Sequence, residues 1–90
     1  MIVKVIKIEP ATAIKIFEKH NVLQEEVHDA LKEGSPKFKK SGGSQYVAIG
    51  LSRGRHITIY FSYDEKTKEA EVTTAYPSSK KQIKSYKKAK

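Results

Sequence analysis

The chain has 90 residues, 38% of them hydrophobic, with eighteen Lys and Arg against ten Asp and Glu, a formal net charge of +8 at pH 7. This length suits a single domain over residues 1–90 with a small core, and without cysteine there is no disulfide framework, thiol chemistry or cysteine-based zinc site. No apolar run is long enough to cross a bilayer and the N-terminus lacks the layout of a signal peptide, so a cytoplasmic protein is expected.

The first third of the chain predicts one strand and two helices. Imperfect alternation of apolar residues with lysine indicates a strand over Ile2–Ile8. Pro10 suits the first helical turn, where its missing N–H is not needed, and begins a helix over Pro10–His20. The apolar residues of that helix recur at helical spacing: Ala13, Ile14, Phe17 and the ring of His20. A one-face apolar stripe predicts a second helix over Leu23–Glu33.

The apolar period then changes from helix to strand. The predicted strands cover Pro36–Lys40, Gln45–Leu51, His56–Tyr63 and Glu69–Tyr76. Ser41-Gly42-Gly43-Ser44 and Ser52-Arg53-Gly54 supply turns between them, the second a tight hairpin turn. Alternation places Ile57, Ile59 and Phe61 on one face of their strand, and His56, Thr58 and Tyr60 on the other. In the last strand the same alternation places Val72, Thr74 and Tyr76 on one face.

After Pro77 the sequence Ser79-Lys80-Lys81-Gln82 has the form of a capping box and begins a final helix. The predicted order is β-α-α-β-β-β-β-α, and hairpin-connected strands imply an antiparallel sheet. The fold class is therefore α+β: an antiparallel sheet of four to five strands, two N-terminal helices and a C-terminal helix. The helices cover one face of the sheet and leave the other face or its edge for function.

The positive charge is unevenly placed. The segment from Ser78 to Lys90 holds six lysines and no acidic residue, and Lys37, Lys39 and Lys40 form a second cluster. Such a field concentrates polyanions, which favours a nucleic acid or an acidic protein as partner. The ordinary alternative is a solvated helix face that lysine keeps soluble.

Three segments of the chain carry a resemblance to a known family. Lys19-His20-Asn21-Val22, followed by Glu25-Glu26-Val27, resembles the KHG-V-x-F-E-E-A segment of BrnT-type toxins, and Tyr46–Gly50 resembles their R-x-x-A-I-G strand. Val72–Lys81 lies where those toxins carry I-S-x-R-x-A-S-K-K. Thr74–Pro77 is also similar to the closing strand of other barnase/RelE-like ribonuclease toxins. The resemblance implies a RelE-like fold, a metal-independent endoribonuclease, and an antitoxin protein that covers the active face.

The chain departs from the family pattern at three positions. Tyr76 aligns with the arginine of the closing strand, so the strand offers a phenol instead of a guanidinium. Asn21 replaces a glycine, and both residue types accept positive φ. Leu23 stands where a capping serine is usual. The first departure bears on the catalytic detail, and the other two do not.

Cleavage of RNA by its own 2′-hydroxyl needs a general base, a general acid and positive charge near the phosphate. The imidazole of His20 can exchange protons near neutral pH, and Thr74 and Tyr76 share a strand face from which both could contact a phosphate. Arg55 suits forked contact with phosphate. The predicted catalytic residues are His20, Arg55, Thr74 and Tyr76, and the predicted RNA-binding residues are Lys19, Arg53, His56, Lys80, Lys81 and Lys84.

Other interpretations of the same residues stay open. The scattered histidines show no metal-ligand spacing and no phosphate-binding glycine loop is present, so no metal or cofactor is expected. Thr74 and Tyr76 could simply favour a strand, and His20 could simply stabilise a helix end. The competing functions are a non-catalytic basic module that binds nucleic acid and an inactive toxin homologue that binds a protein partner.

Overall fold

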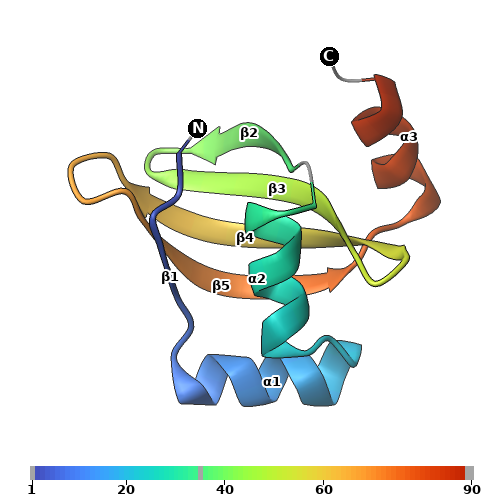
Figure 1. The fold of residues 1–90 in the computed structure, drawn as a ribbon, viewed down its shortest axis with the longest axis horizontal. Helices are drawn as coiled ribbons and strands as arrows, with labels where there is room; N and C mark the ends of the chain where they lie inside the picture. Colours follow the sequence, from blue (N-terminus) through green and yellow to red (C-terminus); the bar gives the residue numbers. More distant parts are fainter. Residues whose placement is uncertain (1, 35, 89–90) are drawn as a thin grey trace.

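The protein is described here by a computed structural model, which covers residues 2–34 and 36–88. These residues form one five-stranded sheet and three helices, which confirms the α+β class. The elements are β1 (Val5–Lys7), α1 (Pro10–His20), α2 (Gln24–Lys32), β2 (Lys37–Gly42), β3 (Gln45–Ser52), β4 (Arg55–Asp64), β5 (Glu69–Pro77) and α3 (Lys80–Lys88). Across the sheet the strands lie in the order β1-β5-β4-β3-β2 (Figure 1).

Strands β2 to β5 form consecutive antiparallel hairpins, as the sequence predicts. The turn between β3 and β4 follows directly from its residues: Ser52 pairs with Arg55, and Arg53 and Gly54 have φ angles of 51° and 84°. Two successive positive φ angles define the type I′ turn, whose twist matches that of the flanking strands. The tight hairpin expected here is confirmed.

The first strand corrects the expectation of a wholly antiparallel sheet. β1 pairs with β5 in parallel, with Val5 opposite Glu69 and Lys7 opposite Glu71. It is also shorter than the predicted Ile2–Ile8. Because a helix follows β1, no hairpin fixes its direction, and it runs instead along the available edge of β5 (Figure 1).

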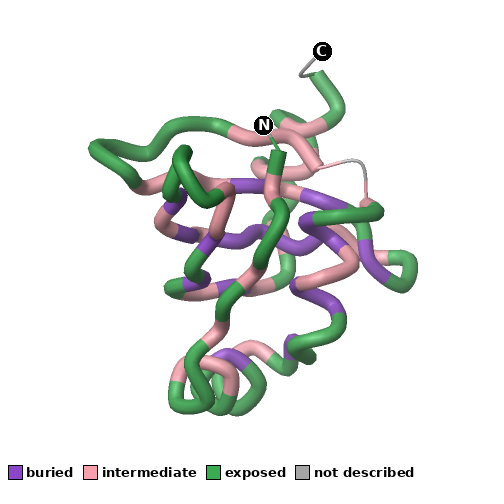
Figure 2. Tube along the Cα trace, turned by 60° about the vertical axis from the view of Figure 1, so that its left-hand side comes forward, coloured by how far each residue is buried: buried purple, intermediate pink, exposed green. Residues whose placement is uncertain are grey.

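The core lies between the sheet and α2. The fully buried side chains of Ile57, Ile59 and Phe61 confirm the predicted inner face of β4, and Val27 and Ala30 cover them from α2. In Figure 2 the buried segments run through the central strands and α2, whereas the described residues near both ends of the chain are mostly exposed or half-buried. Burial of these apolar side chains is the main favourable contribution to folding.

Helix α1 buries a different stripe from the one that the sequence suggests. Ile16 is its buried residue, whereas Ile14 and Phe17 are 57% and 48% exposed. The helix runs beside β5 at the bottom of the molecule (Figure 1), so the sheet covers only a narrow strip of it. The prediction that Ile14 and Phe17 belong to the packed face is therefore wrong.

Helix α3 begins with the predicted capping box. Gln82 N donates to Ser79 Oγ at 3.2 Å, and Ser79 N donates to Gln82 Oε1 at 2.9 Å. None of its described residues is buried, and the helix projects beyond one end of the sheet (Figure 1). No helix among the described residues is long and apolar enough to span a bilayer.

Candidate functional site: a tyrosine and histidine cluster beside the last strand

A bulge in β5 decides which of its side chains reach the face opposite α2. Phe61 pairs with Val72, but the next residue, Tyr60, pairs with Thr74, so Thr73 is an extra residue. The bulge inverts the alternation: Val72 is buried in the core, while Thr74 and Tyr76 lie on the other face with Tyr60. The prediction that Val72 shares their face is wrong, and the shared face of Thr74 and Tyr76 is confirmed.

His20 and Tyr76 lie together, although 56 positions separate their numbers. Their ring centroids are 5.7 Å apart with the planes tilted by 52°. Helix α1 ends at His20 because Asn21 adopts the left-handed conformation, with φ of 55°. This ending places the imidazole beside the end of β5.

Tyr76 also contacts Tyr60 and Gln82. The rings of Tyr60 and Tyr76 stack with centroids 6.3 Å apart, and Gln82 Nε2 donates to Tyr76 Oη at 3.0 Å. The side-chain hydrogen bond with Tyr76 raises the pKa of Tyr60. Tyr60 therefore keeps its proton at neutral pH and is a neutral hydroxyl in this cluster.

Neither Tyr60 nor Gln82 is among the site residues that the sequence predicts. The two signals that could have found them are the shared strand face of His56, Thr58 and Tyr60 and the capping box at Ser79. His20, Tyr76, Tyr60 and Gln82, with the adjoining Thr74, are called the tyrosine cluster below.

Thr74 and Lys19 border the same small hollow as His20. This hollow, of about 260 Å³, lies between α1 and β5, and its lining residues are Thr12, Lys15, Ile16, Lys19, His20, Thr73 and Thr74. Lys15 and Lys19 are exposed, so two lysine side chains border the same hollow as the imidazole. The structure thus brings together three of the predicted catalytic residues and one predicted RNA-binding lysine.

Arg55 does not join the tyrosine cluster. Its Nε and Nη2 donate to the two carboxylate oxygens of Glu26, each at 2.9 Å, and Nη2 also donates to the backbone oxygen of Asn21 at 2.8 Å. Glu26 is only 5% exposed and also accepts a hydrogen bond from Leu23 N. The guanidinium therefore ties the start of β4 to both N-terminal helices, while Arg53 is exposed in the turn.

Removal of Arg55 should reveal its structural role as a pH-dependent loss of stability. The guanidinium lowers the pKa of Glu26 from its ordinary value of 4.5. The ion pair therefore stabilises the fold fully at pH values above 4.5. This stabilisation is lost as the pH falls through the pKa that Glu26 has in the folded protein. Arg55→Ala should cost about 2–3 kcal/mol at pH 7 and less in urea titrations at a pH below 4.5. Arg53→Ala is the control and should change little. An equal cost of Arg55→Ala at both pH values would contradict the assignment.

The remaining predicted RNA-binding residues lie at the α3 end of the sheet. His56 contacts Tyr86, with ring centroids 5.1 Å apart, and its backbone oxygen accepts a hydrogen bond from Ser78 N. Lys80, Lys81 and Lys84 are exposed on α3. Lys37 Nζ lies 5.2 Å from the centroid of the Tyr86 ring, so the second lysine cluster approaches the first.

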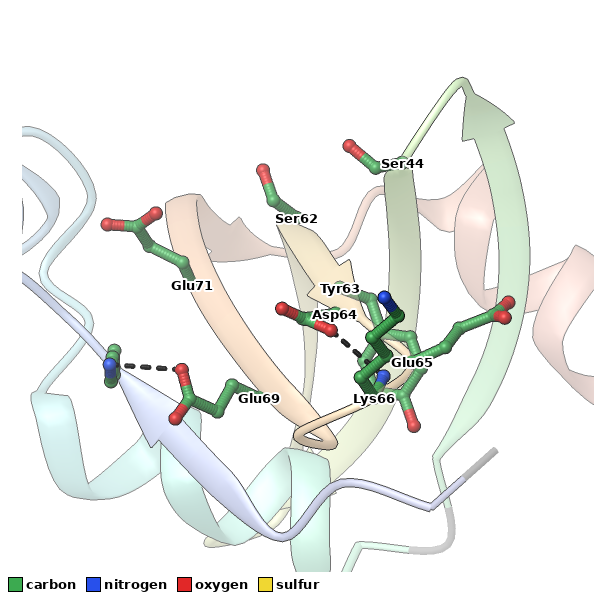
Figure 3. A pocket seen from close by; sticks show the side chains of 9 residues that line it. Ser44, Ser62, Tyr63, Asp64, Glu65, Lys66, Glu69 and Glu71 are labelled. Atoms are coloured by element: carbon green, nitrogen blue, oxygen red, sulfur yellow. Dashed lines mark hydrogen bonds and ion pairs between the residues drawn. The ribbon is translucent and has the colours of Figure 1, made fainter.

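The opposite end of the same sheet face is acidic. A wide hollow of about 710 Å³ is bordered there by Asp64, Glu65, Glu69 and Glu71 (Figure 3). Lys7, which pairs with Glu69 at 3.0 Å, and Lys66 also border the hollow, so its four carboxylates outnumber its two ammonium groups. Although this hollow is larger than the one beside His20, its charge repels phosphate. The sheet face therefore runs from acidic at the β4–β5 turn to basic at α3.

Comparison with known proteins does not assign the chain to a family. The chain matches no protein-family model, and no curated protein matches it significantly. Within residues 2–34 and 36–88, no three His, Asp or Glu side chains gather in a way that could hold a metal ion. The function is therefore inferred from the chemistry of the tyrosine cluster and its surroundings.

Proposed function

We propose that this protein is an endoribonuclease that cleaves RNA by attack of a 2′-hydroxyl on the adjacent phosphate without a metal ion. The observation that carries the proposal is the contact between His20 and Tyr76. An imidazole and a phenol at this separation can serve the two proton transfers that the reaction needs. The resemblance to BrnT-type toxins supports the same reaction and adds an antitoxin protein as partner, with both acting in the cytoplasm.

The geometry suggests a role for each group. His20 takes the proton of the 2′-hydroxyl, whose oxygen forms a bond to phosphorus. The bond from phosphorus to the 5′-oxygen breaks, and Tyr76 gives its proton to that oxygen. The products are a 2′,3′-cyclic phosphate and a free 5′-hydroxyl. Lys15 and Lys19 supply positive charge beside the phosphate, which stabilises the charge that develops in the transition state.

The lysines of α3 extend the cationic surface along the path of the RNA. Lys80, Lys81 and Lys84 are exposed on the helix that follows Tyr76 by one short connection. Such residues hold the phosphate backbone with little dependence on sequence. The acidic hollow at the other end of the face keeps the chain from lying along the whole of β4 and β5.

Incubation of the purified protein with end-labelled single-stranded RNA in excess EDTA tests the proposal. Cleavage into products with 2′,3′-cyclic phosphate and 5′-hydroxyl ends is expected. Double-stranded DNA of equal length is the control, because it has no 2′-hydroxyl and should stay intact. Intact RNA after prolonged incubation, or products with 5′-phosphate ends, would contradict the mechanism.

A second candidate function is non-catalytic binding of single-stranded RNA. The stacked pair of Tyr60 and Tyr76, both half-buried on the face opposite α2, favours it, because aromatic rings stack on unpaired bases. This function predicts retention of uncut RNA, with an affinity that falls as the salt concentration rises. The cleavage assay separates the two candidates. An inactive homologue that serves only a protein partner would neither cleave nor retain RNA.

A further inference from the structure

The side-chain amide of Gln82 has one chemically defined orientation. The backbone N–H of Ser79 can only donate, and it donates to Oε1 at 2.9 Å. Nε2 is therefore the atom that lies 3.0 Å from Tyr76 Oη, and an amide nitrogen can only donate. Tyr76 thus accepts a hydrogen bond from Gln82.

Two hydroxyl groups hold the amide in this orientation. Thr58 Oγ1 donates to the same Oε1 at 3.2 Å, so its single proton is committed, and it accepts from Ser78 Oγ at 2.6 Å. Thr58 is fully buried, which shields these hydrogen bonds from competition by water. The donors therefore point in a defined sequence: Ser78 donates to Thr58, Thr58 donates to the Gln82 oxygen, and the Gln82 nitrogen donates to Tyr76.

Tyr60 is a second neighbour of Tyr76, with the two ring centroids 6.3 Å apart, and the side-chain hydrogen bond with Tyr76 raises the pKa of Tyr60. Because the Gln82 amide nitrogen can only donate to Tyr76 Oη, Gln82 cannot accept the Tyr76 proton. That proton is left for another acceptor.

We propose that Gln82 is a positioning residue that directs the hydroxyl proton of Tyr76 toward bound RNA, an inference that rests on the ribonuclease function proposed above. Gln82 touches no substrate in this role. Because Gln82 donates a hydrogen bond to Tyr76 Oη, the proton of the phenol points away from Gln82. The phenol is therefore oriented as a proton donor before RNA binds. The loop that caps α3 and the acid of the reaction are thereby connected through one side chain.

Gln82→Glu tests the inference because it reverses the direction of the last hydrogen bond while it keeps the size and shape of the side chain. A carboxylate keeps an oxygen for Ser79 N and Thr58, but it offers Tyr76 an acceptor instead of a donor. The phenol should then donate to the introduced carboxylate and turn its proton away from RNA. The expected result is a fall in kcat of roughly tenfold with little change in KM. Ser85→Glu adds the same charge to an exposed position of α3 and should retain kcat.

A second measurement is independent of cleavage. The side-chain NH2 signals of Gln82 in NMR spectra should shift and exchange faster with water in Tyr76→Phe, since the acceptor is lost while the ring remains. Unchanged amide signals, or a kcat in Gln82→Glu equal to that in Ser85→Glu, would overturn the inference. If the unsubstituted protein leaves RNA intact, the ribonuclease function and the catalytic part of this role both fall. The amide signals then still decide whether Gln82 holds the phenol.

Discussion

His20→Ala should lower the rate of RNA cleavage by about 10²–10⁴-fold, the usual contribution of one positioned general base or acid. The imidazole is the group in the tyrosine cluster with a ring nitrogen that can take the proton of the 2′-hydroxyl, because the Gln82 amide is neither an acid nor a base. Binding of RNA should fall much less, because Lys15 and Lys19 beside the imidazole remain. Initial rates and filter binding on the same samples measure the two effects.

The matched control for this variant is His28→Ala. His28 lies on α2, where it borders a separate shallow hollow with Gln24, Glu25 and Asp29, so its loss removes an imidazole without touching the cluster. Cleavage by His28→Ala should stay within about twofold of the unsubstituted rate, well below the effect of a lost catalytic group. Cleavage by His20→Ala at the same level as His28→Ala would exclude His20 as the base.

Gly50→Ala should be among the most destabilising single substitutions in the protein. A Cβ atom at Gly50 would lie 2.1 Å from the backbone oxygen of Ala30 and 2.9 Å from its carbonyl carbon. The obstacle is the backbone of α2, which no side-chain rotation can relieve, so the helix must move away from β3. We expect a loss of at least about 3 kcal/mol, equivalent to roughly 12–24 °C in Tm for a domain of this size.

Gly43→Ala separates this clash from the general cost of replacing a glycine. Gly43 has a φ of 53°, and a Cβ there would meet nothing within 4 Å, so only the left-handed backbone is strained, by about 1–2 kcal/mol. Thermal unfolding of both variants gives the comparison. A Gly50→Ala variant no less stable than Gly43→Ala would mean that α2 does not lie as close to β3 as the structure has it.

The sequence predicts the features of this fold that depend on neighbouring residues. The tight hairpin turn depends on the short segment Ser52-Arg53-Gly54, and the capping box depends on Ser79 and Gln82 at a fixed spacing. Both are local, and both are found. The inner face of β4 follows equally well from alternation, because that strand continues without interruption.

Features that depend on distant partners could not be read in the same way. Nothing in Val5–Lys7 specifies a parallel partner strand some sixty positions later. The bulge at Thr73 contains no residue type that would indicate a bulge from the sequence. Glu26 is 29 positions from Arg55, so the ion pair that withdraws this guanidinium from the tyrosine cluster is invisible in the sequence. Ile14 and Phe17 satisfy helical spacing, but only the position of α1 at the sheet margin decides that Ile16 is buried instead.

The candidate site shows the same division. Strand alternation places Thr74 and Tyr76 together, and the resemblance to BrnT-type toxins draws attention to His20. The contact between His20 and Tyr76 needed the three-dimensional arrangement. Tyr60 and Gln82 emerge only from their contacts, since a tyrosine in a strand and a glutamine in a capping box are both ordinary.

The attachment of α3 has a consequence for how such a protein can diversify. The helix rests on the sheet through polar and ring contacts and contributes no side chain to the interior. Its lysines can therefore be gained, lost or exchanged for acidic residues with little penalty to folding. Affinity for polyanions and choice of binding partner can vary on this helix while the scaffold stays constant.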